Sequence, residues 1–135
     1  MTQRVKLAVL GAGLIGKRHI QHVLAEPSAQ LSAVVDPSLV GETIAKEASV
    51  KWFTSFADMV AADRPDGIIV ATPNQAHVQN GLEAVEAGVP ALIEKPIADD
   101  IISGEKLIAA AEAKGVPLLA GHHRRHNPVM QKAKE

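Results

Sequence analysis

Six short apolar segments alternate along the chain with longer stretches in which apolar residues recur at helical spacing. The short segments are rich in Val, Ile, Leu and Ala, which is typical of buried strands. We expect strands at 5–10, 31–35, 51–54, 68–71, 90–93 and 117–120, with helices at about 14–26, 39–48, 56–62, 75–87, 100–114 and 129–135. Because strands that alternate with helices form a parallel sheet covered on both faces, the pattern predicts an α/β fold.

The first strand is followed by a glycine turn, Gly11-Ala12-Gly13-Leu14-Ile15-Gly16, which opens a helix. In this position Gly11 allows a tight turn, Gly13 lets a pyrophosphate approach the backbone, and Gly16 lets the helix pack closely. The free N–H groups at the start of the helix then hold the phosphates. The turn predicts a dinucleotide-binding fold of the Rossmann type, a doubly wound parallel sheet with strand order 3-2-1-4-5-6.

Asp36 ends the second strand about 20 residues after the turn, where the ribose-binding acid of a dinucleotide site lies. A carboxylate there would accept the hydroxyls of the adenosine ribose and repel a 2′-phosphate, so we expect NAD rather than NADP. Two alternatives remain at this point. The turn and Asp36 could be purely structural, or the ligand could be S-adenosylmethionine, which would make the protein a methyltransferase.

Composition excludes several other classes of protein. The chain has 135 residues, the size of one domain, with a net charge of −1 that gives no electrostatic reason for binding nucleic acid or a membrane surface. It has no cysteine, which excludes a disulfide scaffold, and no apolar run near the roughly 20 residues of a membrane span. We expect a cytoplasmic protein.

Polar residues follow three of the later predicted strands, at the edge of the sheet where ligands of such folds bind. These are Thr72-Pro73-Asn74, Glu94-Lys95-Pro96 and the segment 121–128. We expect Lys95, between an apolar strand and a proline, to be half-buried, which lowers a lysine's pKa toward values useful in proton transfer. A solvent-facing lysine at the start of a loop is the alternative.

Histidines near these strand ends have plainer interpretations. His77 lies in the first turn of a predicted helix, where a histidine is more often satisfied by neighbouring groups than catalytic. His122 and His126 have the spacing of metal ligands on a helix, but they follow a strand and lack a carboxylate or cysteine partner. We therefore expect no metal site.

With these motifs in hand, the chain resembles the N-terminal half of the glucose–fructose oxidoreductase and inositol dehydrogenase family (Gfo/Idh/MocA). The matching elements are the glycine turn followed by His19, the T-P-N-x-x-H element at 72–77, the E-K-P element at 94–96 and the G-x-x-R-R element at 121–128. His126 stands where the family has an aromatic residue. The resemblance covers essentially the whole chain.

The resemblance implies an NAD-dependent dehydrogenase that acts on a sugar- or polyol-like alcohol or carbonyl compound and forms a homo-oligomer. It implies that Lys95 is the catalytic residue, near the nicotinamide ribose and the reacting hydroxyl, and that His123 and Arg124 lie near the nicotinamide or the substrate. Together, the residue patterns and the resemblance give the expected cofactor-binding residues: Gly11, Gly13, Leu14, Ile15, Gly16, Asp36, Thr72, Pro73, Asn74, His77, Glu94, Lys95, His123 and Arg124.

The chain departs from the family in length, because family members continue into a second domain that supplies most of the substrate pocket. We expect a dinucleotide-binding domain at 1–128 and, at 129–135, the start of a truncated helix that would lead to the second domain. The chain alone is then expected to be inactive. A non-catalytic module that binds NAD or a partner protein is the alternative function.

Overall fold

The computed structural model describes residues 3–121 and 128–134. Its six strands form one parallel sheet in the order β3-β2-β1-β4-β5-β6, which confirms the predicted fold and strand order. The strands are β1 (Val5–Leu10), β2 (Ala29–Val35), β3 (Lys51–Phe53), β4 (Gly67–Val70), β5 (Ala91–Ile93) and β6 (Leu118–Ala120). The strands are buried on both faces at the centre of the sheet, which explains their nearly continuous apolar sequences.

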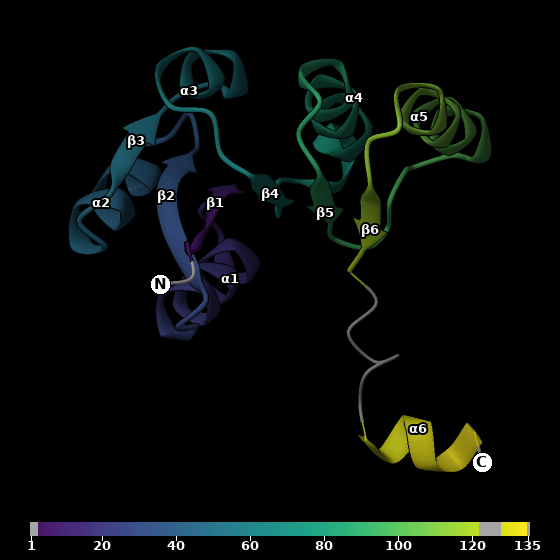
Figure 1. Cartoon of the computed structure of the whole chain (residues 1–135), viewed down its shortest axis with the longest axis horizontal. Helices are drawn as coiled ribbons and strands as arrows, with labels where there is room; N and C mark the ends of the chain where they lie inside the picture. Colours follow the sequence, from purple (N-terminus) through teal and green to yellow (C-terminus); the bar gives the residue numbers. More distant parts are fainter. Residues whose placement is uncertain (1–2, 122–127, 135) are drawn as a thin grey trace.

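Helices cover both faces of the sheet (Figure 1). Helices α1 (Leu14–Ala25) and α2 (Leu39–Glu47) lie on one face, and α3 (Phe56–Ala62), α4 (His77–Ala87) and α5 (Ile101–Lys114) lie on the other. A short helix, α6 (Pro128–Lys134), ends the described chain. None of the helices in the described ranges is long and apolar enough to cross a membrane.

The helix ends follow local sequence signals. Ser38, Ser55 and Asp100 each accept a hydrogen bond from the backbone N–H three residues later, and so begin α2, α3 and α5. Gly88 and Gly115 end α4 and α5 in the left-handed conformation that glycine adopts at little cost. Several predicted boundaries differ by one or two residues. At the start of α4 the difference has a local cause, because a 3₁₀ turn at Asn74–Ala76 precedes the helix, which begins at His77.

A row of apolar side chains crosses the face of the sheet that carries α1 and α2. Val9 pairs in register with Ile69, Ile69 with Leu92, and Leu92 with Leu119. Because α1 and α2 lie against β1, β2 and β3, burial falls along the row toward β6. Val9 is fully buried, whereas Leu119 is 62% exposed.

Candidate functional site

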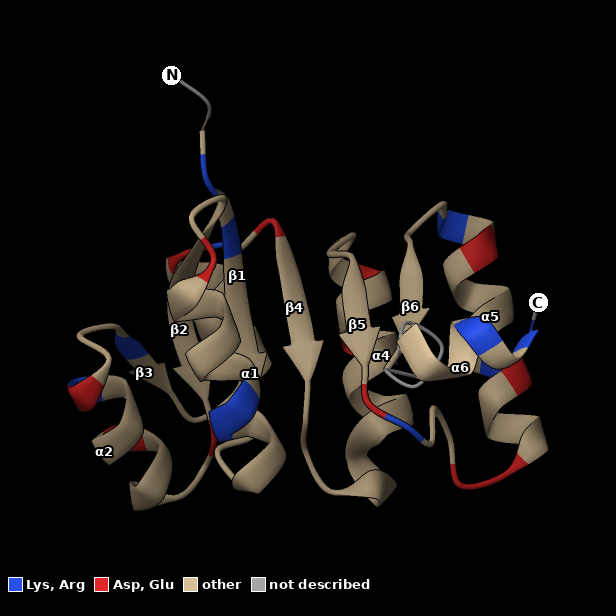
Figure 2. Ribbon diagram, turned by 90° about the horizontal axis from the view of Figure 1, so that it is seen from below, with Lys and Arg blue, Asp and Glu red and all other residues tan. Residues whose placement is uncertain are grey.

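The carboxyl ends of the strands share one edge of the sheet, the lower edge in Figure 2. The strand order reverses between β1 and β4, because the chain continues from β1 to β2 on one side and reaches β4 on the other. Ligands of doubly wound sheets bind outside this reversal. The glycine turn after β1 and the Thr72-Pro73-Asn74 loop after β4 flank it.

Backbone crowding requires glycine at two positions of the turn. Gly11 has a positive φ of 101°, and a Cβ there would lie 2.4 Å from the carbonyl oxygen of Ala71. A Cβ on Gly16 would lie 1.9 Å from the carbonyl oxygen of Gly11. Any side chain at either position would therefore push the start of α1 away from the sheet.

Gly13 differs from its neighbours because it faces open space. A Cβ on Gly13 would meet no atom within 4 Å, and this residue is the N-cap of α1. No side chain caps α1, in contrast to α2, α3 and α5, and no acidic residue lies in its first turn. The free N–H groups and the positive end of the helix dipole thus face a space that suits an anion such as a pyrophosphate. Leu14 and Ile15 in the same turn are 68% and 42% exposed.

Asp36 is fixed beside the turn by hydrogen bonds from its own chain. Its Oδ2 accepts from the N–H of Ala12 at 2.8 Å, and its Oδ1 accepts from the N–H and the hydroxyl of Ser38 at 2.8 and 2.5 Å. The indole Nε1 of Trp52 donates to the Asp36 carbonyl at 2.8 Å. A carboxylate offers about four lone-pair sites, so it can accept a further hydrogen bond without losing a partner.

A cavity of about 480 Å³ lies between α1 and the ends of β4 and β5. Its lining brings together several of the expected cofactor residues with the side chains of α1: Ile15, His19, Thr72, Asn74, His77, Glu94 and Lys95. The Thr72 hydroxyl donates to the amide oxygen of Asn80 at 2.6 Å, which fixes the loop after β4 to α4. The cavity continues the site from the glycine turn toward the β4–β6 half of the sheet.

His77 is buried, and both of its ring nitrogens contact backbone oxygens. Nδ1 lies 2.7 Å from the carbonyl oxygen of Pro96, and Nε2 lies 2.9 Å from that of Thr72. The side chain is 1% exposed. These contacts match the interpretation of a histidine satisfied by neighbouring groups, and they join the loops after β4 and β5.

Lys95 is exposed, so the prediction of a half-buried lysine was wrong. The reason is its position: β5 ends at Ile93, and Lys95 lies in the loop that precedes the cis peptide bond to Pro96. The residue that the fold partly buries is Glu94, whose side chain is 19% exposed.

A contact between Glu94 and His19 is not predicted by any sequence pattern. The Nε2 of His19 donates to the Oε1 of Glu94 at 2.7 Å, and both side chains are 19% exposed. A Cβ on Gly121 would lie 3.0 Å from the Glu94 carboxylate, so the glycine that follows β6 leaves room for it. Each residue belonged to a motif, but the pairing depends on where the fold places α1 relative to the loop after β5, which the motifs do not specify.

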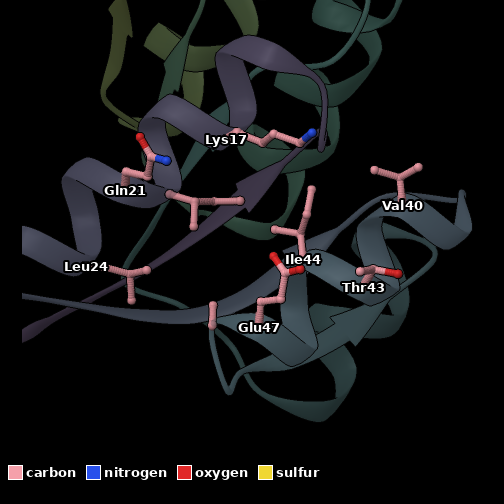
Figure 3. Close-up of a pocket in the computed structure, with 9 residues that line it drawn as sticks. Lys17, Gln21, Leu24, Val40, Thr43, Ile44 and Glu47 are labelled. Carbon is pink, nitrogen blue, oxygen red and sulfur yellow. The ribbon is translucent and has the colours of Figure 1, made fainter.

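A second cavity, of about 440 Å³, lies between α1 and α2 (Figure 3). Leu24 of α1 and Val40 and Ile44 of α2 contribute to its apolar lining, and Lys17 and Glu47 are also among its residues. None of the expected cofactor residues lines this cavity.

His123 and Arg124, which were expected near the nicotinamide, lie outside the described residues.

The glycine turn, the uncapped start of α1 and the fixed carboxylate of Asp36 define a dinucleotide-binding domain of the Rossmann class. A family model described as an oxidoreductase family with an NAD-binding Rossmann fold, Gfo/Idh/MocA, matches residues 5–122. The chain belongs to this family, in agreement with the resemblance and not with the methyltransferase alternative.

Known proteins share the fold over most of the chain. Inositol 2-dehydrogenase of Corynebacterium glutamicum (strain R) is 32% identical over 132 residues, which are 95% of this chain and 39% of that protein. Rhizopine catabolism protein MocA of Rhizobium meliloti is 28% identical over 132 residues, 98% of this chain and 42% of that protein. The crystal structure of scyllo-inositol dehydrogenase from Lactobacillus casei with NAD(H) and scyllo-inositol is 26% identical, with a TM-score of 0.91 over 98% of this chain and 40% of that one. The chain thus spans about two fifths of the length of these relatives.

Proposed function

We propose that the chain binds NAD(H) along the carboxyl edge of its sheet and is the cofactor half of a dehydrogenase acting on a sugar or polyol. The observation that carries the proposal is the hydrogen bond from Ala12 N–H to Asp36, which places a carboxylate beside the glycine turn. The substrate class rests on the inositol dehydrogenases among the relatives.

Each part of the cofactor would meet a group suited to it. The free N–H groups of the first turn of α1 would donate to the pyrophosphate oxygens, above the open space at Gly13. The remaining lone pair of Asp36 would accept from a hydroxyl of the adenosine ribose. The cavity beside Asn74, Glu94 and Lys95 would hold the nicotinamide half.

The chain supplies positioning and a proton-handling group. When bound, the nicotinamide accepts or donates the hydride. Lys95 presents an exposed ammonium group beside the cavity and would hold or move a proton at the oxygen of the reacting hydroxyl. The remaining contacts to the substrate would come from a second domain of the whole protein, because the relatives are about two and a half times as long as this chain.

The choice between NADH and NADPH tests the role of Asp36. Two negative charges about 4 Å apart repel by about 4 kcal/mol at an effective dielectric constant near 20, so we expect NADPH to bind at least about 10-fold more weakly than NADH. Calorimetric titration of the chain with each nucleotide measures the ratio.

Asp36→Asn is the matched variant, because an amide keeps the shape and an acceptor for Ala12 N–H but removes the charge. It should bring the two affinities closer together. Tighter binding of NADPH by the unmodified chain would refute the assignment of Asp36.

A further inference from the structure

The loop after β5 is attached to the rest of the protein on both sides of Lys95. On one side, Glu94 Oε1 accepts a hydrogen bond from His19 Nε2 at 2.7 Å. On the other, the carbonyl oxygen of Pro96 lies 2.7 Å from His77 Nδ1. His19 belongs to α1 and His77 to α4, which cover opposite faces of the sheet, so the loop is held from both faces (Figure 1).

The contact with His19 attaches the loop to α1, the helix whose first turn would bind the phosphates. Both partners are 19% exposed, and a hydrogen bond to a charged group that is partly shielded from water is stronger than an exposed one. The second oxygen of Glu94 accepts from the backbone N–H of Lys95 at 3.3 Å. The middle of α1 and the backbone of Lys95 are thereby joined through a single carboxylate.

The contact with His77 relates the loop to the end of β4. The ring lies between the carbonyl oxygens of Pro96 and Thr72, with Nδ1 2.7 Å from the first and Nε2 2.9 Å from the second. A carbonyl oxygen only accepts, so the ring donates an N–H to at least one of them. At 1% exposure, no water can replace either contact without movement of the chain. His77 therefore sets the spacing between the two loops that line the cavity.

Lys95 itself contributes little to its own placement. Within residues 3–121 and 128–134, its ammonium group has no hydrogen-bond or ion-pair partner, and the side chain is exposed. Its position is set by its backbone, and the backbone is set by the residues on either side.

We infer that His19 and His77 are positioning residues that together hold Lys95 toward the nicotinamide half of the cofactor. This inference rests on the proposed function. Neither histidine needs to touch the cofactor, because each acts through the residue next to Lys95, Glu94 in one case and Pro96 in the other.

The test compares two ligands that share every adenosine and pyrophosphate contact, NADH and ADP-ribose, by calorimetry on the full chain. Loss of a hydrogen bond to a charged group corresponds to about a 10-fold change in affinity. His19→Ala should weaken NADH by about that factor and leave ADP-ribose within about twofold. Gln21→Ala, an exposed residue of the same helix, should change neither ligand.

His77 requires a paired comparison because it is buried. His77→Gln keeps an amide that can donate to a carbonyl, whereas His77→Leu removes every polar atom of the side chain. The Gln variant should retain more of the preference for NADH than the Leu variant. Should the Leu variant fail to fold, His77→Gln still tests His77, and His19→Ala still tests His19.

Several results would overturn the inference. Equal losses for NADH and ADP-ribose in His19→Ala would mean that His19 supports the fold as a whole. Equal affinity of both ligands for the unmodified chain would mean that the loop after β5 adds nothing to binding. Binding of neither ligand would instead refute the proposed function, and the inference with it.

Discussion

Gly13 and Gly16 belong to one turn, but they differ in the space around them. A Cβ on Gly16 would collide with the Gly11 carbonyl at 1.9 Å, while one on Gly13 would enter open space. Gly16→Ala should therefore lower the free energy of unfolding by about 1–3 kcal/mol or more, as overpacked substitutions do. Gly13→Ala should unfold like the parent yet bind NADH more weakly, since its methyl group occupies the space for the pyrophosphate.

Urea unfolding and NADH titration of the two variants check this separation. If Gly13→Ala bound NADH as tightly as the parent, the pyrophosphate would not pass over this residue. Gly115→Ala is a third variant for comparison. Its Cβ also meets nothing within 4 Å, but the φ of 67° makes the substitution strained, so it should lower the free energy of unfolding where Gly13→Ala does not.

Individual residues also show where the sequence was informative and where it was not. The glycine spacing predicted the crowded turn that the structure shows, with Asp36 beside it, because those requirements arise from local backbone geometry. The burial of Lys95 was predicted wrongly, because two residues beyond the end of a strand suffice to take a side chain out of the sheet. The contact of His19 with Glu94 joins residues 75 positions apart, so no local pattern encodes it.

At the scale of elements, Asp63 joins three segments on the edge of the sheet opposite the site. It follows α3 and pairs with Lys6 of β1 at 2.5 Å and with Lys51 of β3 at 3.7 Å. The hydrogen bond from Lys6, foremost, holds the pKa of Asp63 below its usual range. The unfolded chain, with an ordinary aspartate pKa of about 3.9, therefore binds the proton more readily than the folded chain.

It follows that this pairing stabilises the fold above about pH 4 and is lost as the pH falls through the lowered value. Asp63→Asn should be less stable than the parent at neutral pH, and the two should converge in acid. Urea midpoints measured from pH 7 to pH 3 show this, with the exposed Asp99→Asn as the control. A constant difference between Asp63→Asn and the parent across this range would contradict the electrostatic origin.

Elements were predictable to different degrees. The apolar strands, the serine and aspartate caps and the terminal glycines are local signals, and the structure has all of them at or near the expected residues. The start of α4 was predicted about two residues too early, because Pro73 and the 3₁₀ turn place its first α-helical residue at His77. At this first helical residue, the histidine ring contacts the backbone oxygens of Thr72 and Pro96, which lie outside the helix.

For the molecule as a whole, the uneven cover of the sheet predicts self-association. The apolar row that begins at buried Val9 ends at Leu119, which is 62% exposed on an edge strand. Exposed apolar surface on a sheet favours association with other chains. We expect a dimer or larger species whose population rises with concentration.

Light scattering over a concentration series measures the association. Leu119→Lys should shift the protein toward monomer, whereas Leu39→Lys, at an exposed leucine of α2, should not. A parent chain that stays monomeric over the series would show that this surface does not associate.

The position of Trp52 has an optical consequence. It is the only tryptophan, the chain has no tyrosine, and its indole N–H is bonded to the carbonyl of Asp36. Near-ultraviolet emission from this protein therefore reports on one place, the surroundings of Asp36, where we propose that the adenosine ribose binds. NADH absorbs where indole emits and should quench Trp52 by energy transfer, while ADP-ribose, which does not absorb there, can change the emission only by altering the surroundings of the ring. The chain thus carries its own label for separating arrival of the adenosine half from arrival of the nicotinamide, without any added dye.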